Sequence, residues 1–148
     1  MMEKIKKLRE KTGAGVMEIK KALDEAGGDE KKTQDILKKR GVAIAEKKAE
    51  RVTSQGLVDS YIHLGKIGVL VEVNCETDFV ARNENFKEFV HEIALHVAAS
   101  DAKSVSELLI EKYFRDETTT IEELLHETIA KIGENIKIKR FEKYVLGK

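Results

Sequence analysis

The spacing of apolar residues changes at the segment Thr53-Ser54-Gln55-Gly56, and this change most constrains how the chain can fold. Before it, apolar residues recur every three or four positions, which is the period of an amphipathic helix. After it, residues 57–63 and 67–73 alternate between two sets of side chains, which is the period of a β-strand. The sequence therefore predicts a helical first third followed by mixed strands and helices.

The first part, residues 1–41, is expected to form a compact unit of three helices. Gly13 and Gly15 end the first helix, since glycine permits the positive φ angles that reverse a chain. Gly27-Gly28 ends the second helix, and Asp29 suits the N-cap of a third helix that is expected to end at Gly41. The apolar residues expected between these helices are Ile5, Leu8, Val16, Ile19, Leu23, Ala26, Ile36 and Leu37.

Residues 42–55 are expected to form a separate linker helix. The stretch from Ala43 to Arg51 is rich in alanine and charged residues, so it has high helix propensity but little apolar surface to bury. We interpret it as a solvated connection between the helical unit and the remainder of the chain.

Residues 56–148 are expected to form an α+β core. Two antiparallel strands joined at Gly65-Lys66 need further strands or helices to be stable in water. A third strand is predicted over 136–145, with a bulge or bend near Lys139-Arg140 where the alternation changes phase. Capping boxes are predicted at Ser104 and Thr120. The helix expected to cover the sheet carries the apolar stripe Phe86, Phe89, Val90, Ile93, Ala94 and Val97.

No catalytic, metal or cofactor site is predicted. His91 and His96 are five positions apart, whereas a zinc-protease helix needs histidines at i and i+4 to share a face. The glycine pairs do not follow a strand and open a helix, so direct nucleotide binding is not expected. Cys75 has no adjacent base that would lower its pKa, which favours a structural thiol. An enzyme is therefore the weaker hypothesis.

Charge and hydropathy limit the cellular setting. Residues 1–50 and 136–148 have an excess of basic side chains, and residues 51–135 have an excess of acidic ones. This distribution argues against a nucleic-acid-binding protein as a whole. No stretch approaches the roughly 18 apolar residues of a membrane span, and the first residues do not form a secretory signal. We therefore expect a cytoplasmic protein that binds neither membranes nor nucleic acid.

Asp78 and Phe79 directly follow the second predicted strand, so they are expected at the tip of that strand. Phe86 and Phe89 already supply aromatic packing for the following helix, which leaves Phe79 free. An exposed aromatic residue is a typical anchor of a protein interface. The pair is therefore interpreted as a partner-binding site.

Four separated blocks of this sequence resemble the elongation factor Ts family of bacteria. They are Leu8-Arg9-Glu10 with Thr12-Gly13-Ala14-Gly15 and Lys20-Lys21-Ala22-Leu23, then Glu72–Ala81, His96–Ser100 and Lys131–Ile136. The resemblance implies a ubiquitin-associated (UBA-like) helical head and a guanine nucleotide exchange factor. Such a factor binds elongation factor Tu with bound GDP and promotes GDP release by disturbing the phosphate and magnesium site. The partner-binding residues it implies are Arg9, Val16, Met17, Thr77, Asp78, Phe79 and Val80.

The chain has room for one core, so the resemblance is to the short form of the family. That form implies a homodimer that presents two binding surfaces. Two other interpretations stay open at this point. A helical adaptor would use the head alone, and an RNA-binding factor would use Arg9, Lys11, Lys20 and Lys21.

Overall fold

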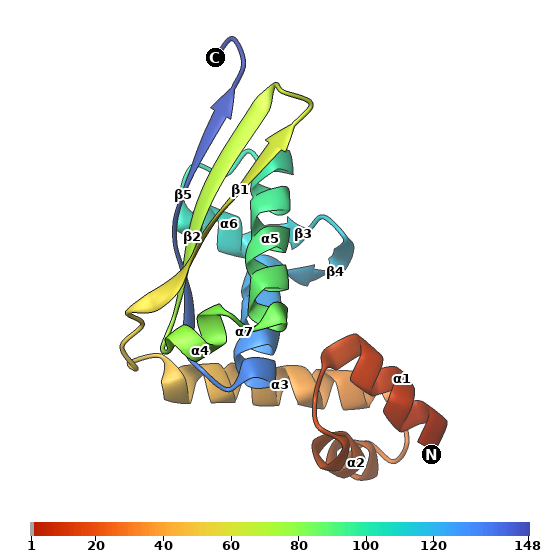
Figure 1. The fold of residues 1–148 in the computed structure, drawn as a ribbon. Helices are drawn as coiled ribbons and strands as arrows, with labels where there is room; N and C mark the ends of the chain where they lie inside the picture. The colour runs from red at the N-terminus through yellow and green to blue at the C-terminus, as the bar shows by residue number, and fades with distance from the viewer. Residues whose placement is uncertain (1) are drawn as a thin grey trace.

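The computed structural model describes residues 2–148 and has an α+β architecture (Figure 1). The helices are α1 (Met2–Thr12), α2 (Val16–Glu25), α3 (Glu30–Lys48), α4 (Asp78–Ala81), α5 (Glu84–Ala99), α6 (Val105–Ile110) and α7 (Ile121–Ile132). The strands are β1 (Gln55–His63), β2 (Ile67–Cys75), β3 (Lys112–Tyr113), β4 (Asp116–Thr120) and β5 (Ile136–Val145). No helix in the described part of the chain is both long and apolar enough to span a membrane.

The main sheet has the order β1-β2-β5, and both pairings are antiparallel. The β2–β5 register shifts where Glu72 pairs with Arg140 and Val73 pairs with Ile138, which leaves Lys139 as the extra residue of a bulge. The third strand and its bend are therefore confirmed. The bulge keeps apolar side chains on the core face at both ends of β5.

Helix α5 lies lengthwise along one face of the sheet (Figure 1). The alternate valines Val69, Val71 and Val73 of β2 point into the core between them, each at most 2% exposed. The predicted apolar stripe of α5 is confirmed, and its members Phe86, Phe89, Val90, Ile93, Ala94 and Val97 are all buried. Thr120 caps α7 with the predicted capping box, and Gly133 at φ 89° ends that helix.

The head comprises α1, α2 and the first half of α3, and it has a small core of its own. Asp29 caps α3 by accepting hydrogen bonds from Lys31 N at 2.9 Å and Lys32 N at 3.1 Å. Positive φ angles at Gly13, Gly27 and Gly28 turn the chain between the helices. The buried residues of this core are Ile5, Leu8, Ile19, Ala22, Leu23 and Leu37.

The prediction of a separate linker helix is wrong. Helix α3 does not end at Gly41 but continues to Lys48 and packs against α7. A glycine inside a helix costs roughly 1 kcal/mol. That cost is offset because Leu37 and Ala45, on either side of Gly41, are 9% and 6% exposed. The head is therefore carried on a helix that also belongs to the core.

Two local features were not predicted correctly. Strands β3 and β4 form a small antiparallel hairpin that the sequence did not indicate. At Ser104 the capping box is incomplete, because Glu107 accepts a hydrogen bond from Lys103 N instead of Ser104 N. The Ser104 hydroxyl still accepts from Glu107 N at 3.2 Å, so α6 keeps its N-cap.

Candidate partner-binding site

Helix α4 presents Asp78 and Phe79 on the surface. Thr77 caps this one-turn helix, and its side-chain oxygen accepts a hydrogen bond from Val80 N at 3.2 Å. Phe79 is 77% exposed, and the exposed Asp78 carboxylate pairs with Arg82 at 3.3 Å. The two residues were expected at the tip of a strand. They stand instead on a helical turn, because the Thr77 cap starts a helix directly after β2.

Val80 has a different position from the other predicted binding residues. Its side chain is only 6% exposed and belongs to the main core, as does that of Ala81. Val80 therefore anchors α4 in the core of its own chain. The outward side of the turn belongs to Asp78 and Phe79, since neighbouring helical residues point about 100° apart.

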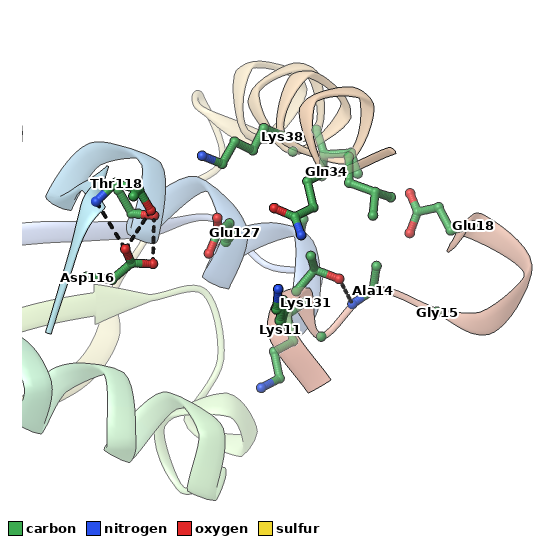
Figure 2. A pocket seen from close by; sticks show the side chains of 17 residues that line it. Lys11, Ala14, Gly15, Glu18, Gln34, Lys38, Asp116, Thr118, Glu127 and Lys131 are labelled. Atoms are coloured by element: carbon green, nitrogen blue, oxygen red, sulfur yellow. Dashed lines mark hydrogen bonds between the residues drawn. The ribbon is translucent and has the colours of Figure 1, made fainter. Parts of the chain in front are cut away.

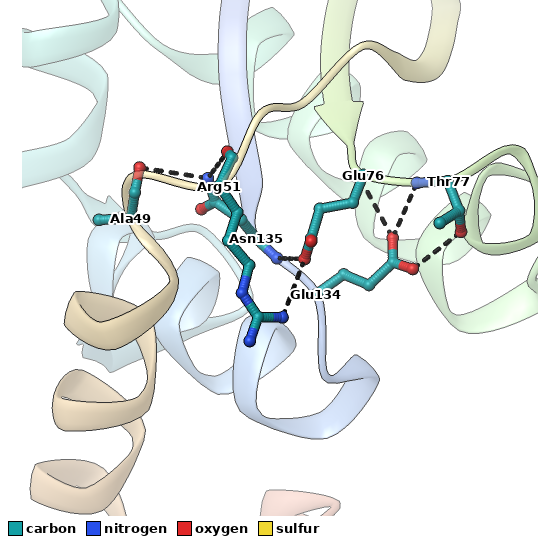
Figure 3. Close-up of polar contacts among 6 residues, drawn as sticks. All are labelled: Ala49, Arg51, Glu76, Thr77, Glu134 and Asn135. Atoms are coloured by element: carbon teal, nitrogen blue, oxygen red, sulfur yellow. Dashed lines mark hydrogen bonds and ion pairs between the residues drawn. The ribbon is translucent and has the colours of Figure 1, made fainter.

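A polar cluster at the base of α4 joins three distant segments (Figure 3). Oε1 of Glu134 accepts hydrogen bonds from Glu76 N and Thr77 N, both at 3.1 Å, and Oε2 accepts from the Thr77 hydroxyl at 2.8 Å. The Glu76 carboxylate accepts from Asn135 N at 2.7 Å and lies 3.7 Å from the Arg51 guanidinium. We call Arg51, Glu76, Thr77, Glu134 and Asn135 the Glu134 cluster.

The Glu134 cluster was not identified from the sequence. Its members lie up to 84 residues apart, since Asn135 Nδ2 donates to Arg51 O at 2.9 Å. The available signal was the block Lys131–Ile136, which places a carboxylate and an amide directly after a helix-ending glycine. That block gave no indication of its partners.

The head carries the other predicted binding residues. Arg9 is exposed near the end of α1, and Val16 and Met17 are 42% and 66% exposed in the first turn of α2. Figure 1 shows the head near one end of α3 and α4 near the other. The predicted residues therefore form two separate surfaces, one on the head and one on α4.

A cleft of about 370 Å³ separates the head from the core (Figure 2). Gln34 and Lys38 of α3 line one side, and Glu127 and Lys131 of α7 line another. Burial raises the pKa of Glu127 above its ordinary value, although the nearby Lys38 ammonium opposes the shift. At Gly13, an added Cβ would lie 2.7 Å from Lys131 Cδ, so the α1–α2 turn lies close against α7.

The structure offers no arrangement for nucleophilic catalysis at its buried histidine. His96 Nδ1 accepts from Phe114 N at 3.3 Å, so Nε2 carries the proton and faces Glu111 Oε1 at 3.0 Å. The Ser100 hydroxyl donates to the same Glu111 oxygen at 2.6 Å and not to the imidazole. His91 lies apart from His96 and contacts Asp59 at 2.9 Å.

Metal binding and thiol chemistry are not supported among the described residues either. Residues 2–148 contain no group of three or more His, Cys, Asp or Glu side chains that could hold a metal ion. Cys75 is fully buried at the end of β2, and burial together with the nearby Glu134 carboxylate raises the pKa of its thiol to about 11. A neutral buried thiol fits the predicted structural role.

Comparison with known proteins assigns the family. Residues 76–148 match the family model described as Elongation factor TS. The chain is 45% identical to elongation factor Ts of Geobacter metallireducens, over 97% of this chain and 88% of that protein. The chain belongs to the elongation factor Ts family. It is also 44% identical to the elongation factor Ts of Thermoanaerobacter sp. strain X514, with 97% and 93% of the two chains covered.

Members of the family differ in length. The alignment with the Geobacter protein extends over 189 positions, so that relative contains residues that have no counterpart in this chain. The elongation factor Ts of Clostridium novyi is 52% identical over 96% of this chain, but the match covers only 47% of that relative. Family membership gives this chain the role of a translation elongation factor.

Proposed function

We propose that this protein is a guanine nucleotide exchange factor that binds elongation factor Tu with bound GDP and promotes GDP release in the cytoplasm. The observation that carries the proposal is the position of Phe79. Its ring is 77% exposed, yet it stands on a helical turn whose base is hydrogen-bonded to the core. An aromatic side chain exposed on a fixed support is suited to insertion into a partner.

Insertion would act on the nucleotide indirectly. GDP is held by contacts to its phosphates and through a magnesium ion, and both weaken when the elements that support those ligands move. The Phe79 ring supplies the wedge, and the adjacent Asp78 carboxylate adds a negative charge beside it. Val80 would contribute by anchoring α4 in the core of its own chain.

The head would supply affinity and not the wedge. Met17 and Val16 offer exposed apolar surface on α2, and Arg9 offers an exposed charged side chain on α1. Two surfaces on one chain bind with an increased effective concentration when the spacing between them fits the partner. Substitution of a head residue should therefore weaken binding to elongation factor Tu more than it slows the release of GDP from the complex once it has formed.

The activity would be driven by binding and would involve no covalent step. A factor that binds nucleotide-free Tu better than Tu with GDP must lower the affinity for GDP, and GDP must lower the affinity for the factor by the same ratio. Excess GTP can then displace the factor and complete the exchange.

The test is the rate at which labelled GDP leaves elongation factor Tu. We expect a large acceleration by the intact chain and a much smaller one by Phe79→Ala. Phe114→Ala is the matched control, since Phe114 is an exposed aromatic residue, at 42%, on the β3–β4 hairpin. The proposal fails if the intact chain does not accelerate release. The role of Phe79 fails if its variant matches the intact chain.

We further propose that two copies pair through the open face of the main sheet, the face opposite α5 (Figure 1). The exposed apolar side chains on this face are Val58 at 66%, Ile62 at 63%, Leu70 at 54% and Tyr144 at 79%. They lie on all three strands, so a second sheet could cover them in the manner of a two-layer sandwich. A dimer formed in this way would leave both α4 helices available to partners.

Sedimentation equilibrium tests this pairing. The intact chain is expected to be dimeric, and Leu70→Lys is expected to shift it toward the monomer by burying a charge at the interface. Ile110→Lys is the control, because Ile110 is 74% exposed on α6, away from the open face. A monomeric intact chain, or an equal effect of both substitutions, would contradict pairing through this face.

A further inference from the structure

Glu134 binds the residues that immediately precede α4. Its carboxylate accepts three hydrogen bonds, from Glu76 N, Thr77 N and the Thr77 hydroxyl, at 3.1, 3.1 and 2.8 Å (Figure 3). These are the backbone and side-chain donors immediately before α4. Hydrogen bonds to an ionised carboxylate are stronger than those between neutral groups.

The Thr77 hydroxyl transmits this arrangement to the helix. A hydroxyl has one hydrogen to donate and lone pairs with which to accept. Because the hydrogen of Thr77 is directed at Glu134 Oε2, a lone pair is left for Val80 N, which lies 3.2 Å from the hydroxyl oxygen. Glu134 thereby orients the cap of the turn that contains Phe79.

Glu134 is itself held in place. Gly133, at φ 89°, ends α7 and directs the chain toward β5. The next residue, Asn135, is 2% exposed and donates its backbone N–H to Glu76 Oε2 at 2.7 Å. The turn from α7 to β5 and the turn from β2 to α4 therefore hold each other through reciprocal carboxylate contacts.

We propose that Glu134 is a positioning residue that fixes the orientation of Phe79 for nucleotide exchange. This inference rests on the proposed function. Helix α4 has four residues, too few to be stable as an isolated helix, so its direction depends on its attachments. Without Glu134 the ring would remain exposed but would adopt several orientations. Restricting the ring to one of these orientations on binding would cost conformational entropy. Less of the binding free energy would then be left to disturb the GDP site.

Two substitutions at Glu134 and one matched control test the proposal. Glu134→Ala removes all three acceptors, and Glu134→Gln keeps one carbonyl oxygen for the backbone donors. We expect Glu134→Ala to reduce the acceleration of GDP release on the order of 10- to 100-fold, as small misplacements of a functional group do, and Glu134→Gln to have a smaller effect. Glu50→Ala makes the same charge change at a nearby exposed residue and should leave the rate unaltered.

A double-mutant cycle with Phe79→Ala separates positioning from general weakening. If Glu134 acts through Phe79, Glu134→Ala causes no further loss in the Phe79→Ala chain. Effects of the two substitutions that multiply would overturn the proposal, and so would an unaltered rate in the Glu134→Ala chain. If Phe79→Ala alone has no effect, the role of Phe79 fails and the proposed positioning fails with it, whereas an intact chain that does not accelerate release is a failure of the proposed function.

Hydrogen exchange of the Val80 amide gives a readout independent of elongation factor Tu. We expect faster exchange in Glu134→Ala than in the intact chain, with Glu134→Gln between them, because the capped turn opens more often. Unchanged protection in both variants would overturn the proposed positioning whatever the exchange assay shows. Thermal unfolding of each variant ensures that the rates are compared between folded chains.

Discussion

The side-chain amide of Asn135 donates hydrogen bonds to two carbonyl oxygens just beyond α3, Arg51 O at 2.9 Å and Ala49 O at 3.3 Å. Asn135 is almost completely buried. Carbonyl groups at the C-terminal end of a helix have no partner within the helix, and the side-chain amide of Asn135 supplies the donor here. The helix that carries the head is thus attached to the turn that supports α4.

Substitution of Asn135 should show the strength of this attachment. We expect Asn135→Ala to lower the free energy of unfolding by about 1–3 kcal/mol, because two carbonyls lose their buried donor. Asn135→Asp should be worse, since it directs a negative charge at carbonyl oxygens near Glu76. Urea unfolding measures both, with the exposed Asn85→Ala as control. Equal stability of Asn135→Ala and the intact chain would contradict the attachment.

Gly56 and Gly41 should respond in opposite ways to alanine. Gly56 has φ 151°, and a Cβ there would lie 2.2 Å from Val73 O. The backbone conformation alone should cost about 1–3 kcal/mol in Gly56→Ala. At Gly41 a Cβ would meet its nearest atom, His126 O, at 3.8 Å, so Gly41→Ala should stabilise α3 by roughly 0.5–1 kcal/mol. Thermal unfolding checks the two signs.

Alanine substitutions of Phe79 and Phe86 should differ in their effect on the free energy of unfolding. Phe79 is 77% exposed and Phe86 is fully buried. Phe79→Ala should change the free energy of unfolding by less than about 0.5 kcal/mol. Phe86→Ala should reduce it by about 3–5 kcal/mol, since it leaves a cavity in the main core. A large loss of stability in Phe79→Ala would mean that its ring supports the fold.

Glu127 should make stability depend on pH. Burial raises its pKa above the ordinary value of 4.5, and the nearby Glu123 and Asp116 carboxylates add to the shift while Lys38 opposes it. The folded state then binds the proton more tightly than the unfolded state, so this group lowers stability as pH rises from 4.5 through the folded pKa.

Glu127→Gln should therefore melt at a higher temperature than the intact chain at neutral pH. The difference should vanish below the unfolded pKa, where the carboxyl is protonated in both states. The control is Glu117→Gln, at an exposed position of the β3–β4 hairpin. The same difference at every pH would show that the ionisation of Glu127 is not its cause.

Sequence patterns identified the elements whose faces are buried. The stripe of α5 and the alternation of β2 repeat over many residues, and each repeat reports the same buried face. The Thr120 capping box was also predictable, because all its atoms lie within four residues. The exposed position of Phe79 was predictable because Phe86 and Phe89 supply the aromatic packing of the adjoining core.

The errors have a common physical origin in tertiary contacts. Gly41 is a local stop signal, but packing of α3 on α7 outweighs it. Strands β3 and β4 are too short to show an alternation. The contacts of Glu134 join residues 57 and 58 positions apart, and no local rule pairs a carboxylate with such distant donors.

Because α3 is continuous, its length fixes both the distance of the head from the core and the rotation of the head about the helix axis. Its 19 residues span about 28 Å, and each residue advances the axis by about 1.5 Å and turns it by about 100°. A single inserted residue would rotate the binding surface of the head by about 100° around the axis of α3 and move it by only about 1.5 Å along that axis. Length variation in this helix is therefore compatible with a shared partner only in steps near whole turns.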